Sequence, residues 1–169
     1  MRPASGWTLV ELIMVMVIVG ILAVFVGPVL LNAVKAYDRT QTTVDTYAKM
    51  RYALERMARE IAAIRRRGAN TTQFDIASMT GTNLTFTKED GTQVAIATAG
   101  SNLNLTYVGT ATGVLTDRVS ALNFAYFRHD GATPAANETE VEFVEIALTL
   151  TDGTTNYGNR LRVALRNVQ

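Results

Sequence analysis

The chain has 169 residues, of which 48% are hydrophobic, enough for one globular domain and a separate apolar segment. It contains no cysteine, which excludes a disulfide framework, a cysteine nucleophile and cysteine zinc ligands. The net charge of +1 hides an asymmetry, because residues 35–67 carry a net +5 and residues 68–169 a net −4. Such an acidic C-terminal part argues against general nucleic-acid binding, so no nucleic-acid partner is expected.

An apolar run dominates the N-terminal part. From Leu12 to Leu31 there are twenty residues without an ionisable side chain. A helix of that length spans about 30 Å, the thickness of the hydrocarbon core of a bilayer. We therefore predict a transmembrane helix over residues 7–31, with residues 12–31 in contact with lipid. A secretory signal peptide fits poorly, because its apolar core has about 7–15 residues and ends at a small-residue cleavage site.

A single carboxylate stands at the entrance to this run. Glu11 immediately precedes Leu12, and a charge close to hydrocarbon costs free energy unless it has a partner. The run itself contains no lysine, arginine or histidine that would supply one. A plain membrane anchor therefore leaves Glu11 without an explanation.

The residues around Glu11 form a pattern. After the short leader M-R-P-A-S-G, the sequence reads G-W-T-L-V-E-L from Gly6 to Leu12. This resembles the N-terminus of the type IV pilin superfamily, which includes pilins, minor pilins and the pseudopilins of type II secretion. The family most often has phenylalanine where this chain has Trp7. The leader, the glycine, the offset carboxylate and the apolar span all agree with the family pattern.

The resemblance implies a route of processing and assembly. A prepilin peptidase would remove leader residues 1–6 by cutting between Gly6 and Trp7, and the new N-terminus would be N-methylated at Trp7. Glu11 would then pair with the N-terminal amine of a neighbouring subunit, although a spacing of four residues also allows Trp7 and Glu11 to meet within one chain. Because a charge is tolerated in an apolar environment only when it is paired, we expect this pair to set register more than to add stability.

Two residues interrupt the predicted transmembrane helix. Pro28 lacks a backbone donor and clashes with the preceding turn, so we predict a kink or local opening at Gly27 and Pro28. Neighbouring helices in a membrane can satisfy the carbonyl that is freed. The resemblance implies that the helix loosens here inside filaments, and a fixed kink without a mechanical role is the alternative.

An amphipathic helical pattern follows the span. Apolar residues recur at mostly three- and four-residue steps, which is the period of a helix, at Tyr37, Val44, Tyr47, Met50, Leu54, Met57, Ile61 and Ile64. Arginines at 65–67 and then Gly68 are typical of a helix C-terminus. We predict one helix from about Leu9 to Arg67, with residues 32–67 as an amphipathic stem.

Two segments resemble particular subgroups of the type IV pilin superfamily. The segment Y-A-K-M-R-Y-A-L-E-R-M-A-R-E-I is similar to the second half of the stem in J-type pseudopilins of type II secretion. The segment G-P-V-L-L-N-A-V-K-A-Y is closer to a minor pilin of the mannose-sensitive haemagglutinin pilus. Many major pilins carry a C-terminal cysteine pair, so its absence favours a minor pilin or pseudopilin.

Residues 68–169 predict a β-rich head. Short strand patterns alternate with turn signals, at 74–77, 84–88, 93–98, 102–108, 119–127, 140–151 and 160–166. The last three alternate apolar and polar residues, which predicts a half-buried antiparallel sheet. Its apolar face should lie on Tyr47, Leu54, Met57 and Ile61, and Asp152-Gly153 should join the last two strands. The expected fold is α+β and pilin-like, a long N-terminal helix packed on an antiparallel sheet.

The head offers little catalytic chemistry. The single histidine, His129, lies in a polar, turn-like stretch and is expected on the surface. The sequence contains neither a phosphate-binding glycine loop nor a G-x-S-x-G elbow. Glu138, Glu140 and Glu142 would share one strand face and are the candidates for Ca²⁺, which some pseudopilins bind. Calcium usually takes its ligands from a curved loop. We therefore expect no cofactor, no metal and no enzymatic activity.

The leading hypothesis is a structural subunit of a bacterial type IV pilus or type II secretion pseudopilus. The precursor would be a single-pass inner-membrane protein with its head in the periplasm, and it would then enter the filament. Its partners would be other pilin or pseudopilin subunits, the prepilin peptidase and an inner-membrane assembly platform. The alternative is a pilus-associated adhesion module whose head grips a surface or a secreted substrate.

Overall fold

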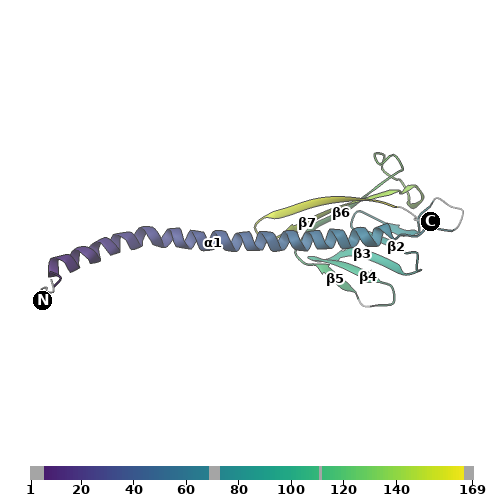
Figure 1. Ribbon diagram of the computed structural model, residues 1–169. Coiled ribbons are helices and arrows are strands. Elements are labelled where there is room, and N and C mark those ends of the chain that lie inside the picture. The colour runs from purple at the N-terminus through teal and green to yellow at the C-terminus, as the bar shows by residue number, and fades with distance from the viewer. Residues whose placement is uncertain (1–5, 69–72, 111, 166–169) are drawn as a thin grey trace, which may run out of the picture. The chain divides into compact units, whose positions relative to one another are not determined.

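The computed structural model describes residues 6–68, 73–110 and 112–165 (Figure 1). Leader residues 1–5 and Arg166, the end of the last predicted strand, lie outside the described residues. The chain divides into two compact units, and the boundary between them falls between Thr42 and Thr43. The helix α1 runs from Leu9 to Ala62, so it supplies most of the first unit and the beginning of the second.

The first unit consists mainly of the N-terminal part of α1. In the described chain, α1 is the one helix that is long and apolar enough to cross a membrane. Its large apolar side chains are exposed on all sides, from Leu9 at 75% to Leu31 at 62%. This is the surface of a helix that has lipid or other helices for its surroundings. The helix continues through Pro28, and the kink there stays a prediction.

The second unit contains two antiparallel sheets (Figure 1). Five strands in sequential order form the first sheet: β1 (Ile76–Met79), β2 (Asn83–Thr87), β3 (Gln93–Ala99), β4 (Asn102–Tyr107) and β5 (Gly113–Thr116). The second sheet consists of β6 (Val119–Phe127), β7 (Phe143–Thr151) and β8 (Asn156–Ala164). A short 3₁₀ helix, η1 (Glu138–Glu140), lies between β6 and β7.

Hydrogen bonds join β6 of the second sheet to turns of the first sheet, and one of them runs from the Val119 N–H to the Ser101 carbonyl over 2.8 Å. The Phe124 N–H donates to the Gly81 carbonyl over 2.7 Å, and the Tyr126 hydroxyl donates to the Thr80 carbonyl over 2.8 Å. A Cβ at Gly81 would lie 3.0 Å from Oδ1 of Asn123. A side chain at position 81 would therefore require the Asn123 side chain to move.

The core lies between α1 and the inner faces of the strands. β7 buries every second side chain, at Val144, Ile146, Leu148 and Leu150, as its alternating pattern predicted. From α1 the core receives Met50, Ala53, Leu54, Met57 and Ile61. The predicted contact face is confirmed for Leu54, Met57 and Ile61. Tyr47 is 52% exposed but packs edge-on against Tyr157, with ring centroids 5.3 Å apart.

The apolar stripe predicted on α1 begins before the part of the helix that the strands cover. Tyr37 and Val44 are exposed, at 68% and 60%. The buried face of α1 begins with Thr46, which is 1% exposed. Periodicity marks which residues share a helix face, but only the position of the strands decides where that face becomes buried.

The predicted end of α1 is wrong, because the helix stops at Ala62 and not at Arg67. The backbone N–H of Arg65 donates to the Thr87 carbonyl over 3.0 Å, and that of Arg67 donates to the Gln73 carbonyl over 2.8 Å. Pairing with neighbouring backbone replaces the helical hydrogen bonds, so the chain leaves the helix before the arginine run.

Most predicted strands are present, with shifted ends. The segment 119–127 is correct, and Asp152-Gly153 does connect β7 to β8, which pair in antiparallel fashion. The strand predicted at 140–151 begins only at Phe143, because Asn137 caps η1 by accepting a hydrogen bond from the Thr139 N–H. Strand β5 was not predicted. Only one of its four residues is buried, so it lacks the alternation of apolar and polar residues that marks a half-buried strand.

A buried ion cluster fastens the last turns of α1 to the first sheet. Glu60 is 5% exposed, lies 2.8 Å from the guanidinium of Arg56 and 3.4 Å from Nζ of Lys88, and accepts a hydrogen bond from the Tyr107 hydroxyl over 2.8 Å. A lone buried carboxylate would be unfavourable, so these partners keep its charge tolerable. The cluster thereby ties the β2–β3 hairpin and the end of β4 to one helix face.

We expect Met57→Ala to lower the free energy of unfolding of the head by about 2–5 kcal/mol, the usual cost of a cavity left by a large core side chain. Met57 is fully buried. Urea unfolding of the full chain in detergent micelles, followed by the circular dichroism of the β-sheet, measures the change. Val44→Ala on the exposed side of α1 is the control and should change the value by less than about 0.5 kcal/mol. Equal effects of the two substitutions would contradict this description of the core.

Candidate functional site

The start of α1 is set by a side-chain cap. Oγ1 of Thr8 accepts a hydrogen bond from the Glu11 N–H over 3.3 Å, and the Thr8 carbonyl accepts one from the Leu12 N–H over 3.2 Å. A hydroxyl in this position satisfies one of the N–H groups that a helix leaves unpaired at its beginning. Thr8 therefore fixes where the helix starts and leaves Gly6 and Trp7 outside it.

Glu11 is the acidic residue in the first turn of α1, and its side chain is exposed. The N-terminal end of a helix carries a partial positive charge, which a carboxylate in the first turn stabilises. A free amine on Trp7 would place a second positive charge at the same end. Glu11 is thus suited to compensate both the helix end and an adjacent ammonium group.

Sequence reasoning missed the role of Thr8. A threonine followed three residues later by a glutamate, ahead of an apolar run, is the pattern of a capping box. Thr8 and Glu11 have that spacing, and the Thr8 side chain caps the Glu11 N–H. The signal was therefore readable in the sequence, independently of any family resemblance.

The structure brings together only some of the predicted site residues. Gly6, Trp7 and Glu11 lie at the exposed start of α1, with Trp7 74% exposed. Gly27 and Pro28 lie inside α1, roughly four turns further along. Processing and pairing are thus predicted at one place, and the kink at another.

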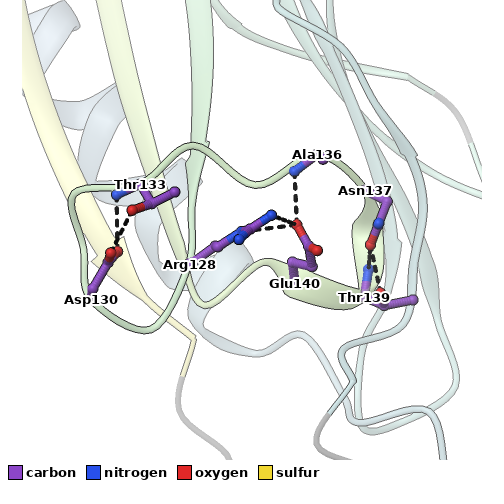
Figure 2. Close-up of polar contacts among 7 residues, drawn as sticks. All are labelled: Arg128, Asp130, Thr133, Ala136, Asn137, Thr139 and Glu140. Atoms are coloured by element: carbon purple, nitrogen blue, oxygen red, sulfur yellow. Dashed lines mark hydrogen bonds and ion pairs between the residues drawn. The ribbon is translucent and has the colours of Figure 1, made fainter.

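The remaining predicted residues, Glu138, Glu140 and Glu142, lie in the connection between β6 and β7. Figure 2 shows Glu140 with its contacts. The Arg128 guanidinium contacts one carboxylate oxygen of Glu140, with Nε at 3.0 Å and Nη2 at 2.8 Å. The same oxygen accepts a hydrogen bond from the Ala136 N–H over 3.0 Å. The hydrogen bond from Ala136, together with the nearby Arg128, lowers the pKa of Glu140 below its ordinary value. Glu140 therefore holds the connection together.

A tight turn precedes this ion pair in the same connection. The Asp130 carboxylate accepts hydrogen bonds from the Thr133 hydroxyl, from the Thr133 N–H over 2.9 Å and from the Ala132 N–H over 3.0 Å (Figure 2). Bonds from Thr133 and Ala132 to the ionised form lower the pKa of Asp130 to about 2. His129 lies in this turn next to Asp130 and is exposed, as expected of a surface residue.

The three candidate calcium ligands do not share a strand face. Glu138 and Glu140 belong to η1, and Glu142 precedes the first residue of β7. Glu140 is paired with Arg128. Within residues 6–68, 73–110 and 112–165, no group of three or more His, Asp or Glu side chains is arranged to hold a metal ion.

We expect the Asp130 turn to lose its stabilising effect only in strong acid. Because the folded pKa, about 2, is below the ordinary value of 3.8, the charged carboxylate stabilises the fold above pH 3.8, and this contribution disappears as the pH falls toward 2. The carboxyl carbon shift of Asp130, followed by NMR across the acid range, reports its pKa. Asp130→Asn should remove this part of the acid dependence. A carboxyl that titrates near 3.8 would contradict the turn geometry.

Comparison with known proteins adds one finding. The family described as the prokaryotic N-terminal methylation motif matches residues 1–27, which include Gly6, Trp7, Glu11 and most of the apolar run. No curated protein matches the chain. The match falls on the capped start of α1, and the second unit has the helix-on-antiparallel-sheet architecture that the resemblance implies. The N-terminal part of the chain therefore carries the methylation motif of type IV pilin-like proteins, on a helix-and-sheet fold of the kind that the resemblance implies.

Proposed function

We propose that this protein is a structural subunit, a minor pilin or pseudopilin, of a bacterial type IV pilus or type II secretion pseudopilus. The observation that carries the proposal is the methylation motif on an exposed, capped helix start with Glu11 in the first turn. An exposed apolar helix follows it directly. Together they supply a cleavage site, a charge pair and a surface for helix packing.

Cleavage between Gly6 and Trp7 requires an accessible peptide bond. Both residues are exposed and precede the capped helix start, so a prepilin peptidase reaches this bond without unwinding α1. The cut produces an ammonium group on Trp7, which N-methylation retains as a cation. Because Thr8 holds the helix start in place, the new terminus lies about one turn from Glu11.

The new ammonium group supplies the partner that Glu11 needs. In an apolar environment either charge alone is unfavourable, and a close pair is tolerated. Pairing between Glu11 of one subunit and Trp7 of its neighbour fixes their relative height. We further propose that α1 loosens at Gly27 and Pro28 as neighbouring helices pack in the filament.

The proposal also gives a location and a set of partners. The precursor is held in the inner membrane by residues 12–31, with its head in the periplasm, and then moves into a pilus or pseudopilus. It needs the prepilin peptidase, an assembly platform and other subunits, and it requires neither cofactor nor metal. A head that also grips a surface or secreted substrate is the second candidate, favoured by a polar cavity of about 240 Å³ beside Arg128, His129 and Glu142.

Intact mass and N-terminal peptide mapping of the chain from its native membrane test the processing step. We expect a chain that begins at Trp7 and carries a methyl group on its amine. Gly6→Leu, which changes only the residue before the cut, should leave the leader attached. A chain that still begins at Met1 in a host with an active prepilin peptidase would contradict the proposed function.

Replacing Glu11 tests the charge pair. We expect Glu11→Ala to be inserted and cleaved normally but to enter filaments at least about tenfold less, because an unpartnered buried ammonium costs several kcal/mol. The fraction of the chain in sheared filaments, against that left in the membrane, measures assembly. Glu89→Ala, which removes an exposed carboxylate from the head, is the matched control. Unchanged assembly of Glu11→Ala would show that the pair does not set register.

A further inference from the structure

The second unit has an open apolar groove between α1 and β5, which we call the α1–β5 groove. It has a volume of about 590 Å³ and is lined by Ala48, Lys49 and Tyr52 of α1 and by residues 114–117. Tyr52 and Val114 are 57% and 59% exposed. Two large apolar side chains thus face solvent across a concave surface, which is typical of a site that a partner covers.

Lys49, the cation that lines the groove, is already paired with carboxylates of this chain. Nζ of Lys49 lies 3.0 Å from Oδ1 of Asp117 and 3.6 Å from Oδ2 of Asp45. The hydrogen bond between them raises the pKa of Lys49 and lowers that of Asp117, so both stay charged at neutral pH. A partner carboxylate would have to compete with Asp117 and Asp45 for Lys49 and would lose hydration, whereas an uncharged apolar partner pays no such cost.

The same chain carries a segment with matching chemistry. Residues 12–31 contain no ionisable side chain, and the candidate membrane span is not buried within its own chain. Gly20, Ala23 and Gly27 follow each other at steps of three and four, which places them on one helix face.

The glycines on that face are not required by close packing within the described residues. A Cβ at Gly20 or at Gly27 would meet nothing within 4 Å, so the fold of the subunit itself does not require either glycine. Small residues on a helix allow large side chains of a partner to approach the helix backbone closely.

We propose that the α1–β5 groove of one subunit receives the uncharged N-terminal helix of a second copy of this chain. Tyr52 and Val114 pack against the face formed by Gly20, Ala23 and Gly27. This inference rests on the proposed function, because the helix must leave the lipid to reach a neighbour's groove. It adds a second contact to the pairing of Glu11 and Trp7, and it explains why a strand edge and a helix leave an apolar surface uncovered in the single subunit.

Disulfide cross-linking tests the contact, because the chain has no cysteine of its own. One copy carries Val114→Cys and a differently tagged copy carries Gly20→Cys, and the two are expressed together. A disulfide forms only when the Cα atoms come within about 7 Å, so we expect a mixed-tag dimer in isolated filaments. Ala121→Cys, an exposed position on β6 in the other sheet, replaces Val114→Cys in the control, and the dimer should be lost. Ala23→Cys is the second position on the helix, should Gly20→Cys fail to assemble.

The possible outcomes distinguish a failure of the groove proposal from a failure of the proposed function. Filaments of processed chain that yield no dimer, or yield equal dimer with Ala121→Cys, overturn the groove proposal and leave the proposed function standing. A disulfide to a cysteine of another protein in place of a second copy also overturns it. A chain that is neither cleaved nor assembled overturns the proposed function, and the groove proposal falls with it. Val114→Glu should reduce assembly while Ala121→Glu does not, with circular dichroism in detergent confirming that both heads fold.

Discussion

The structure depends on one helix that must satisfy two different environments. In its first part α1 exposes apolar side chains on every side, which suits lipid or neighbouring helices. From Thr46 onward it buries one face in the core of the second unit. Packing of this face against the strands supplies most of the stability of the helix in the second unit.

The two ends of α1 are set by different interactions. At the start, Thr8 caps the helix with its own side chain, which is a local device that works in any surroundings. At the far end, backbone pairing of Arg65 and Arg67 with neighbouring segments ends the helix, and Glu60 is surrounded by partners from the first sheet. The start can therefore serve processing and assembly without affecting the head.

The capped start of α1 and the α1–β5 groove would make two different kinds of contact in an assembly. As proposed, pairing of Glu11 with Trp7 would be a point contact between charges, which would define the relative height of neighbouring subunits. Packing of Tyr52 and Val114, both exposed in the single subunit, would be an apolar contact that covers the part of the N-terminal helix that has left the lipid. Charge pairs provide specificity more readily than stability, and apolar burial does the reverse. A subunit that leaves a membrane for a filament, as proposed for this chain, would require both.

The sequence by itself determined the features that depend on neighbouring residues. The apolar run and the alternation along β7 are local patterns, and each predicted its element correctly. The cap at the start of α1 is also local, because Thr8 and Glu11 carry its spacing in the sequence. The tertiary structure decided what depends on competition between distant segments. The helix ends at Ala62 because backbone pairing replaces helical bonds, and Val44 is exposed because the strands cover α1 only from Thr46. The groove joins residues of α1 to residues of β5 that are more than sixty positions away, so no local pattern contains it.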